Sequence, residues 1–177
     1  MIADGVLAVV SLCCAAWLWQ GGGIRQKHGA LGLVLVAVAA AIGSARYGGM
    51  PLEALHVRAS HVASAIGVPM IGGAYVAWTP KTLRNAAVTV MLMGLLLMEN
   101  ADYRLGAGAL AMVLVLVPRQ PIGAVGALLT IFAGLGIGTN GDWGGIARLD
   151  LFHYTLSVAN ICLAVGLSKL PSDALRA

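Results

Sequence analysis

Apolar runs long enough to cross a lipid bilayer take up nearly the whole chain. A membrane-spanning helix needs about 20 mostly apolar residues to cross ~30 Å of hydrocarbon, and about 17 are enough in some cases. Only 10% of the 177 residues are charged, against roughly 25% in soluble domains. The qualifying runs lie at residues 2–19, 29–46, 55–77, 83–98, 103–118, 121–138 and 150–168. We therefore predict an all-α, polytopic membrane protein, with residues 1–177 forming a single seven-transmembrane-helix bundle.

Some details of this plan stay open. The fifth and sixth runs are short, so an arrangement with six spans is the alternative to seven. No basic residue precedes the first run, and residues 20–23 lack a small-x-small cleavage site, so we interpret this run as a span rather than a signal peptide.

Pro69 should kink the third span. The connection at 139–148 is rich in glycine and is either a lid or a turn.

Small residues should let the helices pack closely. The chain has 24 glycines and many alanines, and helix interfaces in membranes are enriched in such residues because they allow the backbones to approach. The clearest surfaces of this kind are Ala37 to Ser44 and the series Gly134, Gly136 and Gly138. We expect tight contacts at both.

The distribution of lysine and arginine predicts the orientation in the membrane. Seven of these residues lie on one face (Arg25, Lys27, Lys81, Arg84, Arg119, Lys169 and Arg176) and four on the other (Arg46, Arg58, Arg104 and Arg148). By the positive-inside rule the first face is cytoplasmic, so the N-terminus is outside and the C-terminus inside, in what we take to be a bacterial inner (plasma) membrane. The net charge of +4 then reflects topology and requires no nucleic-acid partner. His28, beside Lys27 on the inner face, is expected to be solvated.

The acidic residues and histidines gather on the opposite, outer face. Among the acidic residues only Asp173, in the C-terminal tail, breaks this pattern, and among the histidines only His28. The outer set comprises Asp4, Glu53, Glu99, Asp102, Asp142 and Asp150 with His56, His61 and His153. We therefore expect any chemistry at the outer face.

The last span carries a polar stripe. Asp150, His153, Ser157 and Asn160 recur at helical spacing, and such a stripe must face the bundle interior because burying it in lipid is costly. One interpretation is a metal ligand or acid/base group at His153, oriented by Asp150 or by a neighbouring helix. The other is an interhelical hydrogen-bond seam that holds the bundle together.

The third span begins with two histidines. His56 and His61 are five residues apart, about 140° around a regular helix, so an undistorted helix cannot point both at one metal ion. His61 with Ser64 makes one inward patch, and a bend at the helix mouth would be needed to bring His56 in. Arg58 either pairs with Glu53 or holds an anionic headgroup or substrate.

Two short segments are similar to motifs of a known superfamily. They are Gly43-Ser44-Ala-Arg-Tyr47-Gly48 at the end of the second span and Leu149-Asp150-Leu-Phe-His153 at the start of the seventh. With the span plan, they resemble the seven-span membrane hydrolases that include the alkaline ceramidases and the progestin-receptor-like proteins. In that superfamily three histidines bind zinc, and the metal-bound water cleaves an amide.

The resemblance is partial. Gly48 stands where the family's first histidine is expected, and Leu149 where the first of its last histidine pair is expected. Only Ser44 and His153 carry over residue by residue. The resemblance implies that His56 or His61 supplies the missing nitrogens and Asp150 an oxygen.

Taken together, these features predict a metal-dependent hydrolase of lipid-like amides or esters at the outer face. The candidate zinc ligands are His56, His61, His153 and Asp150. The candidate catalytic residues are Ser44 and Arg58, which would stabilise an oxyanion, and Asp102, from the acidic cluster at 99–102. Membrane lipids and a lipid-like substrate are the expected partners.

Two other functional classes stay open. The small size and the incomplete histidine set also fit a non-catalytic accessory or scaffold subunit of a larger membrane complex. A small transporter is the third hypothesis, but the inner half of the bundle offers almost no polar lining for a conduit.

Overall fold

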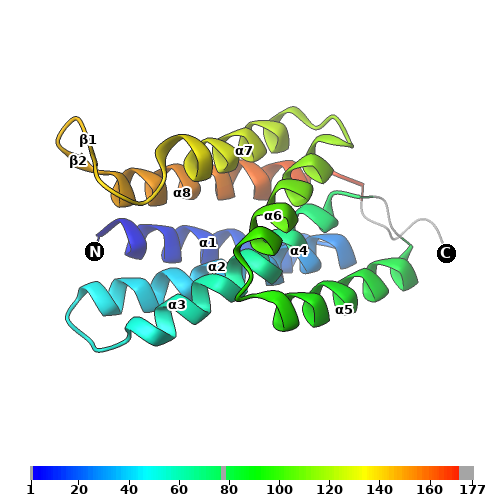
Figure 1. The fold of residues 1–177 in the computed structure, drawn as a ribbon. Coiled ribbons are helices and arrows are strands. Elements are labelled where there is room, and N and C mark those ends of the chain that lie inside the picture. Colours follow the sequence, from blue (N-terminus) through cyan, green and yellow to red (C-terminus); the bar gives the residue numbers. More distant parts are fainter. Residues whose placement is uncertain (1, 77–78, 172–177) are drawn as a thin grey trace.

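Helices make up almost all of the structure. The computed structural model describes residues 2–76 and 79–171, and Figure 1 shows their arrangement. Within these residues the elements are α1 (Ile2–Gly21), α2 (Ile24–Tyr47), α3 (Glu53–Val62), the π-helical turn η1 (Ala63–Gly67), α4 (Val68–Ala74), α5 (Pro80–Leu97), α6 (Ala101–Leu116), α7 (Pro121–Ile131), the π-helical turn η2 (Phe132–Ile137), β1 (Asp142–Trp143), β2 (Ile146–Ala147) and α8 (Arg148–Ser168). The all-α prediction is confirmed.

The helices follow the apolar runs of the sequence. Five of the seven runs fall on one helix each, the third covers α3, η1 and α4, and the sixth covers α7 and η2. The third run ends at residue 77, which lies outside the described residues. α6 and α7 are separate helices. Among the described residues three helices, α1, α2 and α8, are long and apolar enough to cross a membrane. Asp173 and Arg176 lie outside the described residues.

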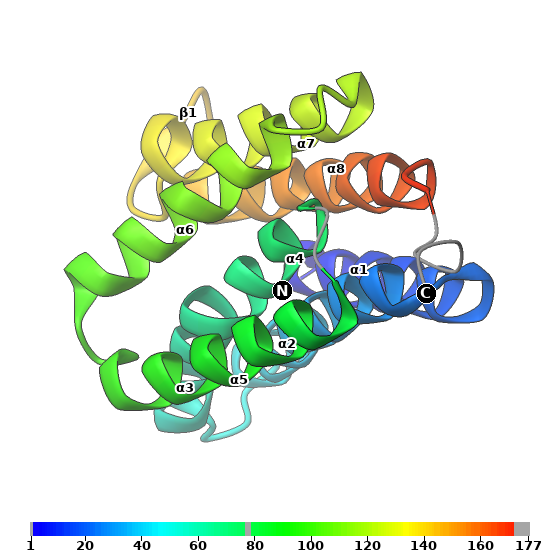
Figure 2. The same cartoon turned by 90° about the vertical axis from the view of Figure 1, so that its right-hand side faces the viewer.

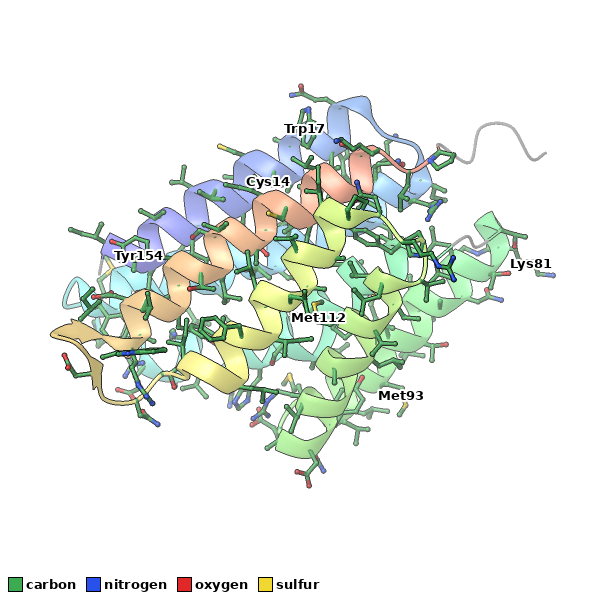
Figure 3. The ribbon with its side chains drawn as sticks, turned by 90° about the horizontal axis from the view of Figure 1, so that it is seen from above. Cys14, Trp17, Lys81, Met93, Met112 and Tyr154 are labelled. Carbon is green, nitrogen blue, oxygen red and sulfur yellow. The ribbon has the colours of Figure 1, made fainter. Side chains whose placement is uncertain are left out.

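The helices pack around α2, which contacts α1, α3, η1, α4 and α8. α1 packs along both α2 and α8, and α7 packs along α8. α4 lies between these helices and α6, whereas α5 contacts the rest mainly through η1 and α4 and lies at the edge (Figure 2). Met112 lies in the middle of the bundle, and Lys81 and Met93 of α5 lie at its periphery (Figure 3). The largest core cluster includes Leu18, Leu33, Tyr75, Met112 and Leu163.

Large apolar side chains cover the outside of the bundle. Every long helix exposes several of them, among them Val9, Leu12, Leu31, Val38, Leu92, Leu96, Leu110, Val113, Leu128, Leu135, Val158 and Ile161. A soluble monomer rarely exposes a continuous apolar surface of this extent. The exterior is thus suited to contact with lipid.

Glycines allow close helix contacts, but not all at the predicted positions. A Cβ on Gly72 of α4 would lie 2.4 Å from the Ala111 carbonyl oxygen of α6, and one on Gly32 would lie 2.5 Å from the Gly67 carbonyl oxygen. The predicted contacts of α2 are confirmed, since Ala37, Ala40 and Gly43 are buried. The prediction for 134–138 was wrong: nothing lies within 4 Å of a Cβ on Gly134 or Gly138, and one on Gly136 would meet Phe132 of the same helix.

The third span is interrupted where Pro69 predicts a break. The π-helical turn η1 ends at Gly67, directly before Val68 and Pro69. Proline has no N–H to continue the regular hydrogen-bond ladder, and π-helical turns of this kind often mark functional sites. The turn divides the span into α3, which approaches the cavity described below, and α4, which packs in the core.

Two basic side chains near the start of α2, Arg25 and His28, are buried. Arg25 donates from Nε to the Ala74 carbonyl oxygen (3.0 Å) and from a terminal nitrogen to the Tyr75 carbonyl oxygen (2.7 Å). It thereby satisfies carbonyls that the end of α4 leaves open. His28 is only 8% exposed, so the expectation that it is solvated was wrong: it lies a full turn inside α2, where neighbouring helices cover it.

The glycine-rich connection is a β-turn hairpin. β1 and β2 pair antiparallel, and Gly144 and Gly145 between them have φ of 62° and 84°. These positive φ values are easily adopted only by glycine. The Gly145 N–H donates to Asp142 Oδ1 (3.1 Å). The hairpin is exposed and leads straight into α8, so of the two interpretations the turn is the one observed.

Candidate functional site

A largely apolar cavity opens between the helices, with ionisable groups lining part of its wall. Its volume is about 370 Å³, within the range of pockets that bind small molecules. The apolar wall includes Leu7, Val36, Leu105, Met112 and Leu135, and the polar lining consists of Asp4, His56, Ser60, Ser64, Arg104, Thr130 and His153. The cavity is therefore shaped for an apolar chain beside a polar group.

Asp4 is the most deeply buried of these ionisable groups. It lies in the first turn of α1, inside the first apolar run, and is 1% exposed. Its Oδ1 lies 3.5 Å from Nδ1 of His153 on α8. The close packing of α1 against α8 brings the carboxylate to the histidine. A buried carboxylate beside an imidazole is an arrangement suited to holding and moving a proton.

His56 approaches the same carboxylate from α3. A Cβ placed on Gly43 of α2 would lie 2.7 Å from Asp4 Oδ1, 3.0 Å from His56 Cε1 and 3.4 Å from His56 Nδ1. Both groups thus border the space that the missing side chain at position 43 leaves open. Asp4, His56 and His153 form one cluster, which we call the Asp–His cluster.

The other ring nitrogen of His56 faces a serine. His56 Nε2 lies 3.5 Å from Ser60 Oγ. The two residues are one helical turn apart on α3, so their side chains share a face. The ring also packs edge-on against Tyr47, with ring centroids 6.1 Å apart. His56 thus links the Asp–His cluster to Ser60.

His61 lies outside this cluster. Its Nδ1 is 3.1 Å from Glu99 Oε2, in the turn between α5 and α6. The prediction that one regular helix cannot aim both histidines at one point agrees with this arrangement. The contact also places the connection between α5 and α6 beside the third helical turn of α3 rather than beside its first residues. In Figure 1 this connection therefore does not reach the end of the bundle where the β1–β2 hairpin lies.

The remaining predicted site residues are dispersed. Ser44 lies near Gly5 of α1 and does not line the cavity. Arg58 and Asp102 are exposed and do not line it either. Asp150 is half-buried and acts electrostatically on His153. Glu53 pairs with Arg46 at 2.9 Å, and not with Arg58.

The stripe on α8 divides between the cavity and the interior of the bundle. His153, one turn beyond Asp150, is 8% exposed and lines the cavity. Deeper in the bundle, Asn160 Nδ2 donates to Ser11 Oγ of α1 at 2.9 Å, and Ser157 Oγ donates to the carbonyl oxygen of His153 at 2.8 Å. The interhelical hydrogen bond predicted for the stripe is present at Asn160. The metal or acid/base role of His153 stays a prediction.

The predicted zinc ligands do not come together as a set. Within residues 2–76 and 79–171, no group of three or more His, Cys, Asp or Glu side chains is arranged to hold a metal ion. His61 is engaged with Glu99, and His153 with Asp4. This donor arrangement does not fit zinc as it stands, so we derive no chemical step through a metal. Zinc binding stays a prediction.

Asp4, Ser60 and Gly43 were not among the predicted site residues. A carboxylate inside an apolar span is by itself a signal of function, and it would have singled out Asp4. The spacing of four between His56 and Ser60 is also visible in the sequence. Gly43 has no such signal, because its role depends on how α1, α2 and α3 pack.

Neither a protein-family model, nor a curated protein, nor a solved structure matches this chain. The resemblance to the seven-span membrane hydrolases therefore stays a prediction.

Proposed function

We propose that this protein is a seven-span integral membrane hydrolase that cleaves the ester or amide bond of a lipid-like substrate. The observation that carries the proposal is the cavity, in which an apolar wall adjoins the Asp–His cluster. An acyl chain would lie along the apolar wall, and its carbonyl carbon would lie beside the cluster.

Two features support a location in the membrane: the apolar side chains on the outside of the bundle, and the distribution of lysine and arginine between the two ends of the helices. Three helices have the length and apolarity of membrane spans, and the others present apolar side chains outward. We propose that all seven segments cross the membrane, with the N-terminus outside and the Asp–His cluster toward the outer leaflet, since most lysines and arginines lie at the opposite ends of the helices.

The chemistry requires a group that takes a proton and gives it back. A histidine is the usual group for this task near neutral pH. His56 and His153 both line the cavity, and Asp4 would orient the histidines of the cluster, in part through the contact between its Oδ1 and Nδ1 of His153. Arg104 lines the same cavity and brings a positive charge to it; there it would favour the negative charge that develops on the carbonyl oxygen.

Acyl hydrolysis by the purified protein tests the proposal. The full-length protein in detergent micelles would be supplied with fluorogenic esters and amides carrying short and long acyl chains. We expect turnover of long-chain substrates and a loss of about 100-fold or more in His153→Ala and Asp4→Asn, the size of a general acid–base contribution. His61→Ala is the matched control, since it removes a histidine outside the cavity and should keep nearly full activity.

Absence of turnover with every substrate would overturn the proposal. So would equal loss in His153→Ala and His61→Ala. Zinc analysis of the same samples tests the separate prediction of a metal: stoichiometric zinc that is lost in His153→Ala would support it.

A non-catalytic accessory subunit is the second candidate function, and α5 favours it. Among the α5 residues whose side chains are described, only Leu83 and Gly94 are buried, while Val88, Met91, Leu92, Leu95 and Leu96 are exposed. This face is open to a partner helix as well as to lipid. The accessory function becomes the better account when the purified protein is monomeric and shows no acyl turnover.

A further inference from the structure

Ser60 is placed as a nucleophile rather than as a packing residue. It lines the cavity, and its Oγ lies 3.5 Å from Nε2 of His56. Nδ1, on the other side of the same ring, is buried and has no hydrogen-bond partner among the described residues. Like Asp4 Oδ1, it lies within 3.4 Å of the point that a Cβ on Gly43 would occupy. Serine, imidazole and carboxylate thus follow one another in the order that activates a serine hydroxyl in hydrolases.

We infer that Ser60, His56 and Asp4 form a serine-nucleophile triad that carries the acyl group of the substrate as a covalent ester. The inference rests on the proposed function and names the residue that attacks. It also differs from the metal-bound water that the family resemblance implies.

The chemical steps balance within these residues and water. Ser60 Oγ attacks the carbonyl carbon, and its proton passes to His56 Nε2. The bond to the leaving alcohol or amine breaks, and His56 returns the proton to that group. Water then attacks the acyl-serine with His56 again as the base, which releases the fatty acid and restores the Ser60 hydroxyl.

Neighbouring serines do not have this geometry. Ser64 lines the same cavity, but its Oγ donates to the carbonyl oxygen of His61 at 3.0 Å. Ser44, the serine suggested by the family resemblance, does not line the cavity. Of the described serines in the cavity wall, Ser60 is the one whose Oγ contacts an imidazole.

Gly43 controls the approach of the carboxylate to the imidazole. A methyl group at this position would lie 2.7 Å from Asp4 Oδ1 and 3.0 Å from His56 Cε1. Gly43→Ala therefore separates Asp4 from His56 without changing Ser60, His56 or Asp4 itself. Because its φ is helical, alanine fits the backbone at this position.

Covalent labelling is the test. The full-length protein in detergent would be treated with an alkyl fluorophosphonate, which reacts with activated serines, and the adducts counted by intact-protein mass spectrometry. We expect one adduct per chain in the wild type and in Ser64→Ala, and none in Ser60→Ala. His56→Ala should slow labelling by about 100-fold or more, and Gly43→Ala should slow it as well. Tryptophan-fluorescence melting would confirm that each variant is folded.

The outcomes separate this inference from the proposed function. Hydrolysis that persists in folded Ser60→Ala, or labelling that persists there, overturns the triad and leaves the hydrolase standing. A wild type that turns over lipid esters without any labelling also overturns the triad. A wild type with neither labelling nor turnover overturns both.

Discussion

Asn160 is a polar side chain buried inside the bundle and satisfied by a hydrogen bond to a neighbouring helix. The amide donates to Ser11 Oγ, and both residues are at most 5% exposed. In a membrane neither group can turn to water, so each depends on the other. Interhelical hydrogen bonds of this kind contribute about 0.6 to 2 kcal/mol. This pair ties α1 to α8, the two helices whose contact also brings Asp4 to His153.

Ser11→Ala should therefore lower the free energy of unfolding by about 1 kcal/mol. The measurement is a denaturation titration with SDS in mixed micelles, followed by tryptophan fluorescence. Ser168→Ala is the control: Ser168 is exposed, and its hydroxyl bonds only Val165 of its own helix among the described contacts. Equal stability of Ser11→Ala and the wild type would show that the Ser11–Asn160 bond contributes nothing.

At the scale of elements, α4 and α6 approach each other closely at Gly72. A Cβ on Gly72 would lie 2.4 Å from the Ala111 carbonyl oxygen and 2.5 Å from its Cα. Backbone atoms cannot turn aside as a side-chain end can, so the helices would have to separate. Gly72→Ala should destabilise the protein by about 1–3 kcal/mol, the usual cost of overpacking.

Gly106→Ala is the matched control for this contact. Gly106 lies on α6 with nothing within 4 Å of an added Cβ. Replacing a helical glycine at such an open position removes an entropic cost of about 0.5–1 kcal/mol. We expect this variant to be as stable as the wild type or more stable, by the same SDS titration. If both variants were destabilised by the same amount, the loss at Gly72 would not come from the close contact between α4 and α6.

At the scale of the whole molecule, the charge distribution makes a prediction about sidedness. Cysteines would be introduced singly at Gly144 in the hairpin and at Lys81 at the start of α5, in a background in which Cys13, Cys14 and Cys162 are replaced by alanine. A membrane-impermeant maleimide should label Gly144→Cys in intact cells, and Lys81→Cys only after lysis. The reverse pattern would overturn the proposed orientation.

The sequence predicts what depends on local composition and leaves out what depends on packing. The apolar runs locate every helical segment, because membrane length and apolarity are properties of the run itself. The stripe of α8 is likewise visible from its spacing. The proximity of Asp4 to His153, by contrast, requires that α1 lie beside α8. The burial of Arg25 and His28 depends on where α4 ends and how closely its neighbours cover α2.

In the proposed membrane setting, the turn between α5 and α6, which ends short of the first residues of α3, should thin the bilayer around it. Glu99 contacts His61, eight residues beyond the first residue of α3, which is about 12 Å along a helix. Glu99 and Asp102, both exposed, would then sit at the depth of lipid tails if the leaflet were flat. Lipids respond to a short hydrophobic surface by local thinning. On this side the outer leaflet should dip toward the turn and carry its ester linkages down to the level of the cavity.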